Sequence, residues 1–134
     1  MNIVVDASVV ASALLDAGDE GSWAENVLRS HACIAPALLP VEVTSVLRRA
    51  SLAGEISDEL ASQAHRDWID LPMDLMPYEP FAPRVWELRH SVRPYDAWYV
   101  GIAEAFDIPF ATFDQRLSRA PGLRCRWLVP SKRD

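Results

Sequence analysis

Short apolar runs alternate with longer helical patterns along this chain, and that alternation is the strongest constraint on its fold. Ile3 to Val5 is the first run, a β-branched segment typical of a strand that is buried on both faces. Strands that are separated by helices need right-handed crossovers, which produce a mostly parallel sheet. We therefore predict an α/β fold with three layers, in which helices cover both faces of a mostly parallel central sheet.

The expected elements follow one another without a repeat, a linker or a domain boundary, so we predict a single domain over residues 1–134. Strands are predicted at residues 3–5, 33–35, 75–77, 109–113 and 127–129. Helices are predicted at residues 8–17, 22–30, 40–53, 57–69, 83–91 and 97–106, with a short helical turn at 115–118. Gly18 and Gly54 mark the ends of two of these helices.

The charge balance is acidic, with a formal net charge of −6 at pH 7, and this by itself argues against a nucleic-acid partner. The basic residues are nearly all arginine, however, and they are enriched in the C-terminal segment. An acidic chain can still act on a polyanion when its carboxylates hold cations and its rim is basic. Arg116 and Arg119 are the side chains that we expect to contact such a substrate.

Targeting and membrane-spanning segments are not recognisable in the sequence. No basic side chain precedes the first apolar run, and no uncharged stretch approaches the roughly 20 residues that span a bilayer. Cys33 and Cys125 form no CxxC pair and have no metal-ligand spacing with the histidines. We therefore expect a cytoplasmic protein with reduced cysteines and no membrane association.

Four acidic residues fall where predicted strands end or helices begin. Asp6 and Asp114 each follow a strand. Asp96 starts an apolar helix, and Glu42 lies on the apolar stripe of a helix that follows a strand. Each position also has an ordinary explanation, because Asp is a favoured helix N-cap and the helix dipole favours acids in the first turn. Ser8 could cap the first helix instead, which would leave the Asp6 carboxylate free.

In a parallel sheet these four positions share the carboxyl edge, so we expect the four carboxylates to lie together. Two unit charges about 4 Å apart repel by about 4 kcal/mol at an effective dielectric of 20. Such a cluster needs protonation, arginine partners or divalent cations. A set of oxygen ligands without His or Cys suits Mg²⁺ or Mn²⁺ and argues against zinc.

Four short segments around these acids carry a family resemblance over essentially the whole chain. They are Val4-Val5-Asp6-Ala7-Ser8, Glu42-Val43 with Leu47-Arg48-Arg49 downstream, Tyr95-Asp96-Ala97 followed by Ala103-Glu104-Ala105, and Thr112-Phe113-Asp114-Gln115-Arg116-Leu117. In this order they resemble the four blocks of PIN-domain proteins, and the chain length and block order resemble the VapC-type toxins of bacteria.

The resemblance implies a metal-dependent endoribonuclease that cleaves single-stranded or looped RNA. It implies that a group of acids is catalytic and surrounds one or two Mg²⁺ or Mn²⁺ ions, namely Asp6, Glu42, Asp96 and Asp114. Ser8 and Thr112 would support this site through hydrogen bonds. Metal-activated water would attack phosphorus in line and leave a 5′-phosphate and a 3′-hydroxyl. As toxins of this type do, the protein would form a homodimer and bind a cognate VapB-like antitoxin.

Apolar residues on three predicted helices also suggest a partner. They are Leu14, Leu15, Trp23, Val27 and Leu47, which could not all pack into one core. An apolar groove left between these helices would bind an amphipathic segment, and the resemblance makes the antitoxin that partner, with a basic side chain reaching the acids. The alternative is that these residues face the sheet or a homodimer interface.

Two other functional classes stay open. A non-catalytic α/β binding module would use all four acids only as helix caps. An aspartyl-phosphate enzyme also places an Asp at the end of its first strand, but it needs a second nearby acid and a lysine. Here Ser8 stands two residues after Asp6, and the only lysine is Lys132, beyond the last predicted strand.

Overall fold

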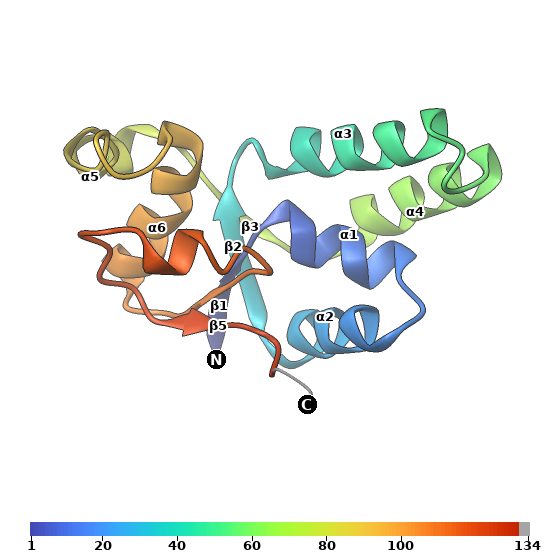
Figure 1. Cartoon of the computed structure of the whole chain (residues 1–134), viewed down its shortest axis with the longest axis horizontal. Coiled ribbons are helices and arrows are strands. Elements are labelled where there is room, and N and C mark those ends of the chain that lie inside the picture. The colour runs from blue at the N-terminus through green and yellow to red at the C-terminus, as the bar shows by residue number, and fades with distance from the viewer. Residues whose placement is uncertain (132–134) are drawn as a thin grey trace.

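The computed structural model describes residues 1–131, which form a five-stranded parallel sheet with helices on both faces (Figure 1). Its strands are β1 (Asn2–Val5), β2 (Ala32–Pro36), β3 (Asp74–Met76), β4 (Phe110–Ala111) and β5 (Trp127–Leu128). Their order across the sheet is β3-β2-β1-β4-β5, and each neighbouring pair is parallel. The predicted α/β fold is therefore confirmed. Lys132, the lysine beyond the last strand, lies outside the described residues.

The helices form the two outer layers. One face of the sheet is covered by α1 (Ala7–Leu15), α2 (Asp19–Ser30), α3 (Leu39–Leu52) and α4 (Asp58–Asp70), and the other by α5 (Ala82–Glu87) and α6 (Pro94–Phe106) (Figure 1). Two short 3-10 helices are η1 (Glu79–Phe81) and η2 (Leu117–Arg119). Within residues 1–131, none of the helices has the length and apolar character that crossing a membrane requires.

The core is centred on β1. Ile3, Val4 and Val5 have no exposed surface, as expected of a central strand with helices on both faces. On the α6 side, the ring of Tyr99 stacks on that of Phe110 in β4, with 5.3 Å between the ring centroids. This packing places the first turn of α6 beside the ends of β1 and β4. The four acids that were predicted to lie together are found at these ends.

Several boundaries differ from the predicted ones for local reasons. β4 ends at Ala111, because the Thr112 hydroxyl accepts a hydrogen bond from the Asp114 amide at 3.0 Å and turns the chain. α6 begins three residues earlier than predicted, since Pro94 suits a first helical turn. The helix predicted at 83–91 is wrong at its end: α5 stops at Glu87, and hydrogen-bonded turns follow.

The five apolar residues that were expected to compete for the core divide between its centre and its border. Val27 and Leu47 are buried, whereas Leu14, Leu15 and Trp23 are half-buried and pack against the core. The hollow that lies between α3 and α4, about 460 Å³ in volume, is lined mostly by polar and charged side chains. The apolar groove was predicted between α1, α2 and α3, which is a different place from this hollow, so the groove stays a prediction.

Candidate active site

Asp6 stands at the junction where β1 ends and α1 begins. Because β1 and β4 pair in register, Asp6 and Thr112 leave neighbouring strands side by side. The Thr112 hydroxyl donates to Oδ2 of Asp6 at 2.5 Å, and the Ser8 hydroxyl donates to Oδ1 at 2.5 Å. The Val9 amide also donates to Oδ1, at 3.2 Å, so Asp6 itself is the N-cap of α1. The expectation that Ser8 caps this helix is wrong, since Ser8 binds the carboxylate instead.

All four predicted acids line one pocket of about 400 Å³ at the carboxyl edge of the sheet. Glu42 comes from the first turn of α3, and Asp96 comes from the first turn of α6. Asp114 comes from the loop after β4. The other lining residues are Ala7, Ser8, Arg93, Tyr95, Tyr99 and Phe113. The structure thus brings together four carboxyl groups that are distant in sequence, while their catalytic role stays a prediction.

Local hydrogen bonds to backbone amides, at a helix cap or in a turn, account for two of these acids and not for the others. Asp6 caps α1, and Oδ1 of Asp114 accepts the amides of Arg116 and Leu117, both at 3.1 Å. Asp96, in contrast, lies inside the first turn of α6, whose N-cap position belongs to Arg93. Glu42 and Asp96 therefore have no capping role, and the structural explanation left for them is the helix dipole, which favours acids in a first turn.

The pocket holds its carboxyl groups at unfavourable electrostatic cost. The pKa of Glu42 is raised to about 7, chiefly by burial and then by the negative charges of Asp6 and Asp96. Burial also raises the pKa of Asp6, although two hydroxyl hydrogen bonds oppose that shift. Burial also raises the pKa of Asp96, although the positive charge of the adjacent Arg93 opposes that shift. A cation in the pocket would relieve this repulsion and lower all three pKa values.

The donor set fits a hard divalent ion. Oε2 of Glu42 is buried and has no hydrogen-bond partner among the described residues, which is costly for a carboxylate oxygen. As the side chains stand, no group of three or more His, Cys, Asp or Glu residues within residues 1–131 could by itself hold a metal ion in a protein cage. Mg²⁺ needs no such cage, because it keeps several waters and binds through one or two carboxylates and substrate phosphates.

Three lining residues of the pocket were not predicted from the sequence. The Nε atom of Arg93 lies 3.7 Å from a carboxylate oxygen of Asp96, and the Arg93 side chain is 86% exposed. Tyr95 and Tyr99 lie one turn apart on α6, and their hydroxyl oxygens are 3.1 Å apart. Their spacing of four residues, on a helix with an acid in its first turn, is the sequence signal that could have identified them.

The two arginines predicted to contact a substrate lie at different distances from the acidic pocket. Arg116 lines a neighbouring hollow of about 510 Å³, together with Arg93, Asp96 and Asp114. Arg119 lines neither this hollow nor the acidic pocket, and its guanidinium lies 3.5 Å from the side-chain oxygen of Gln115. Arg116 is therefore the better placed of the two at the rim.

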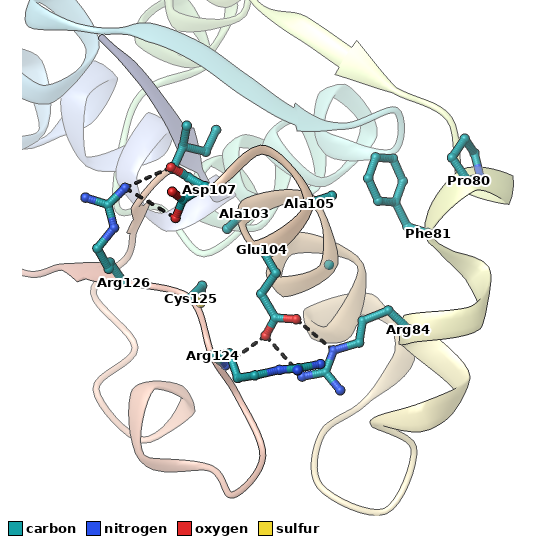
Figure 2. Close-up of a pocket in the computed structure, with 12 residues that line it drawn as sticks. Pro80, Phe81, Arg84, Ala103, Glu104, Ala105, Asp107, Arg124, Cys125 and Arg126 are labelled. Carbon is teal, nitrogen blue, oxygen red and sulfur yellow. Dashed lines mark hydrogen bonds and ion pairs between the residues drawn. The ribbon is translucent and has the colours of Figure 1, made fainter.

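Glu104 belongs to a different part of the molecule, beside the last turns of α6 (Figure 2). Its carboxylate accepts two hydrogen bonds from Arg84, at 2.7 and 3.1 Å, and one from the backbone amide of Arg124 at 2.8 Å. Arg84 also donates to the carbonyl of Gly122 at 2.7 Å. We call Arg84 and Glu104 the clasp. It holds the 122–124 segment against α6 and α5, and its carboxylate is fully engaged.

The comparisons with known proteins agree with this fold. The model of the PIN domain matches residues 3–123, and this chain belongs to the PIN-domain family. Ribonuclease VapC1 of Mycobacterium tuberculosis is 42% identical to it, over 91% of this chain and 92% of the relative. The resemblance to PIN-domain proteins of the VapC type is confirmed.

Solved structures of such proteins share the fold at low sequence identity. VapC20 of Mycobacterium tuberculosis, described as a Sarcin-Ricin loop cleaving toxin, superposes with a TM-score of 0.66 at 18% identity, over 91% of this chain and 96% of VapC20. DNA-bound VapBC from Salmonella typhimurium gives a TM-score of 0.67 at 15% identity, over 96% of this chain and 98% of that one.

Proposed function

We propose that this chain is a VapC-type endoribonuclease, the toxin of a toxin–antitoxin pair, and that it cleaves RNA in the acidic pocket with Mg²⁺ or Mn²⁺. The ribonuclease assignment follows from family membership and from a relative of 42% identity that is a ribonuclease. The observation that carries the site is the meeting of four carboxyl groups from four separate segments in one pocket.

The pocket residues have distinct tasks in this proposal. Asp6, Glu42, Asp96 and Asp114 would hold one or two ions. When bound, an ion supplies an activated water and offsets charge on the phosphate. Asp6 is kept in one orientation by its hydrogen bonds from Ser8 and Thr112. Glu42, whose pKa is raised to about 7, would be held in its deprotonated form by a bound cation.

Cleavage assays test the catalytic part of the proposal. The purified chain should cut RNA in Mg²⁺ or Mn²⁺, stop in chelator, and resume when excess metal is added. Asp6→Asn and Asp96→Asn should abolish cleavage while circular dichroism shows a retained fold, whereas Asp70→Asn, at the exposed end of α4, should leave it unchanged. Undiminished cleavage in chelator, with metal removal verified, would refute the metal site.

A partner-bound resting state follows from the toxin assignment. Two structural neighbours are VapBC complexes, one from Rickettsia felis and one from Salmonella typhimurium. We propose that this chain likewise binds a VapB-like antitoxin, which offsets the clustered carboxylates with a basic side chain, and that it forms a homodimer. Co-expression with an adjacent short reading frame should yield a stable, inactive complex. A chain that purifies alone and harms no host when induced would contradict the toxin role.

A further inference from the structure

A second hollow, of about 410 Å³, lies beside the acidic pocket between the first turns of α3 and α6. We call four of its lining residues the shelf: Leu38, Val41, Ser45 and Tyr95. Three further lining residues, Glu42, Arg93 and Asp96, also line the acidic pocket. The two hollows therefore share a wall, and a ligand bound on the shelf lies directly beside the four carboxyl groups.

The shelf presents apolar surface with few polar groups. Leu38, the N-cap residue of α3, is 46% exposed and Val41 is 61% exposed, and their spacing puts them on the same side of the helix as Ser45. The ring of Tyr95 is held by the hydrogen bond between its hydroxyl and that of Tyr99, so it forms a fixed wall. Exposed aliphatic side chains next to a fixed aromatic ring suit a flat ligand with an apolar face, and the Ser45 hydroxyl suits its polar edge.

We propose that the shelf binds one unstacked base of the RNA, on a nucleotide adjacent to the phosphate that is cut. This inference rests on the proposed ribonuclease function and adds a specificity site to it. Single-stranded RNA is recognised largely through splayed bases that rest on apolar or aromatic side chains. The shared wall then places the phosphate of that nucleotide in the acidic pocket.

The basic side chains around the shelf provide binding positions for an RNA strand. Arg93 lines the shelf hollow, the acidic pocket and the hollow that contains Arg116. Its ion pair with Asp96 is long, at 3.7 Å, and its side chain is 86% exposed, so it is free to pair with a phosphate instead. A single-stranded RNA can thus place a base on the shelf, a phosphate at Arg93 and a further phosphate at Arg116.

A second copy of this chain suits the shelf less well. Its two strongly exposed apolar side chains are Leu38 and Val41, whereas a stable protein interface buries about 800 Å² per partner. A twofold contact here would also bring the carboxyl groups of both copies close together, and these already repel one another within one pocket. A nucleotide, in contrast, brings a negatively charged phosphate, which a cation in the acidic pocket and Arg93 can bind.

Cleavage of a randomised single-stranded RNA pool, followed by sequencing of the new ends, tests the proposal. The wild-type chain should show a base preference at one nucleotide next to the cut, and Leu38→Ala and Val41→Ala should flatten that preference. Leu52→Ala is the matched control, because Leu52 is 70% exposed at the far end of α3. Removal of the base at the preferred nucleotide should lower wild-type kcat/KM about tenfold, and the shelf variants much less.

The outcomes separate this inference from the function on which it rests. If the wild-type chain cuts no RNA, the proposed function fails. If it cuts RNA but an abasic nucleotide beside the cut has no effect, the shelf is not a base subsite. Photo-crosslinking of 4-thiouridine RNA to the inactive Asp6→Asn variant should label peptides of α3 or α6 that contain the shelf. A change of oligomeric state in Val41→Ala, with an unchanged base preference, would make the shelf a dimer face and overturn the proposal.

Discussion

The Thr112 hydroxyl donates a hydrogen bond of 2.5 Å to Oδ2 of Asp6, across a separation of 106 residues in the chain. The same hydroxyl oxygen accepts the amide of Asp114 at 3.0 Å. Thr112 is completely buried, so it has no alternative partner in water. One side chain therefore fixes both the orientation of Asp6 and the turn that brings Asp114 into the pocket.

Replacing Thr112 by Val keeps its shape and removes both hydrogen bonds. We expect ribonuclease activity to fall about 10- to 100-fold, the usual effect of losing a residue that orients a metal ligand. The unpaired Asp114 amide should also lower the free energy of unfolding by about 1–3 kcal/mol. Thr44→Val is the control, because Thr44 is exposed on α3 and its hydroxyl donates to the Pro40 carbonyl of the same helix. Full activity of a folded Thr112→Val variant would show that Asp6 needs no such support.

Glu42 should make the metal-free protein less stable as pH rises. Its folded pKa of about 7 lies above the ordinary value of 4.5, so the folded state holds this proton more tightly than the unfolded state does. The resulting stabilisation is complete below pH 4.5 and is lost as pH rises through about 7. Glu42→Gln mimics the protonated form. It should therefore raise the free energy of unfolding at pH 8 by about 2 kcal/mol, discounted for partial solvent access, and change it little at pH 4.5.

Urea unfolding in chelator at pH values between 4.5 and 8 measures this difference. The control is Glu20→Gln, since Glu20 also lies in a first helical turn but is exposed. The free energy of unfolding of Glu20→Gln, relative to the wild type, should not rise comparably with pH. A wild-type chain and a Glu42→Gln variant that stay equally stable across the range would mean that Glu42 is not held in a repulsive pocket.

Asp96 can be tested as an ion ligand without any RNA. Added Mg²⁺ or Mn²⁺ should stabilise the wild-type fold by about 2.7 kcal/mol when the ion is at 100 times its Kd. Asp96→Asn removes one negative charge from the pocket, so it should lose most of this gain while keeping or raising metal-free stability. Thermal unfolding at increasing metal concentration, with Asp70→Asn as control, gives the comparison. An equal gain in Asp96→Asn would exclude Asp96 from the ligands.

The sequence was sufficient to predict the edge of the sheet at which the acids meet. Asp6 and Asp114 follow apolar runs, and the ends of parallel strands lie at one edge, so their proximity follows from fold class. The same logic placed Glu42 early in one helix and Asp96 at the start of another on that edge, and the structure has both in first helical turns. These predictions needed only periodicity, because the backbone direction alone determines where such positions lie.

The sequence was insufficient where side chains from separate helices decide the contact. The shelf joins Val41 of α3 to Tyr95 of α6, and no local pattern says which faces of two distant helices meet. The expectation that Ser8 could cap the first helix was wrong for a similar reason, whereas its hydrogen bond to Asp6 is present. A Ser hydroxyl near a helix start can donate to a carboxylate or accept an amide, and the position of Asp6 decided between these two bonds.

The clasp of Arg84 and Glu104 should support stability and not catalysis (Figure 2). Both side chains are largely buried, with 18% and 14% exposure, and the pair makes two direct hydrogen bonds. Burial raises the pKa of Glu104, but the hydrogen bonds from Arg84 and from the Arg124 amide outweigh it and leave that pKa lowered. The stability that Glu104 contributes is therefore present above its ordinary pKa of 4.5 and is lost as pH falls through the lower folded value.

Glu104→Gln leaves the Arg84 guanidinium without its counter-charge. Breaking a buried pair by removing one partner costs about 3–5 kcal/mol, and we expect about 2–3 kcal/mol here because both groups retain some solvent access. Urea unfolding at pH 7 measures the loss, which should shrink towards pH 3. Glu25→Gln is the control, since its ion pair with Arg29 is exposed and 3.8 Å long, and it should change stability by less than about 0.5 kcal/mol. The folded variant should cleave RNA at the wild-type rate, because the clasp lies at the opposite end of α6 from Asp96. A loss of cleavage in fully folded Glu104→Gln would instead connect this end of α6 to the active site.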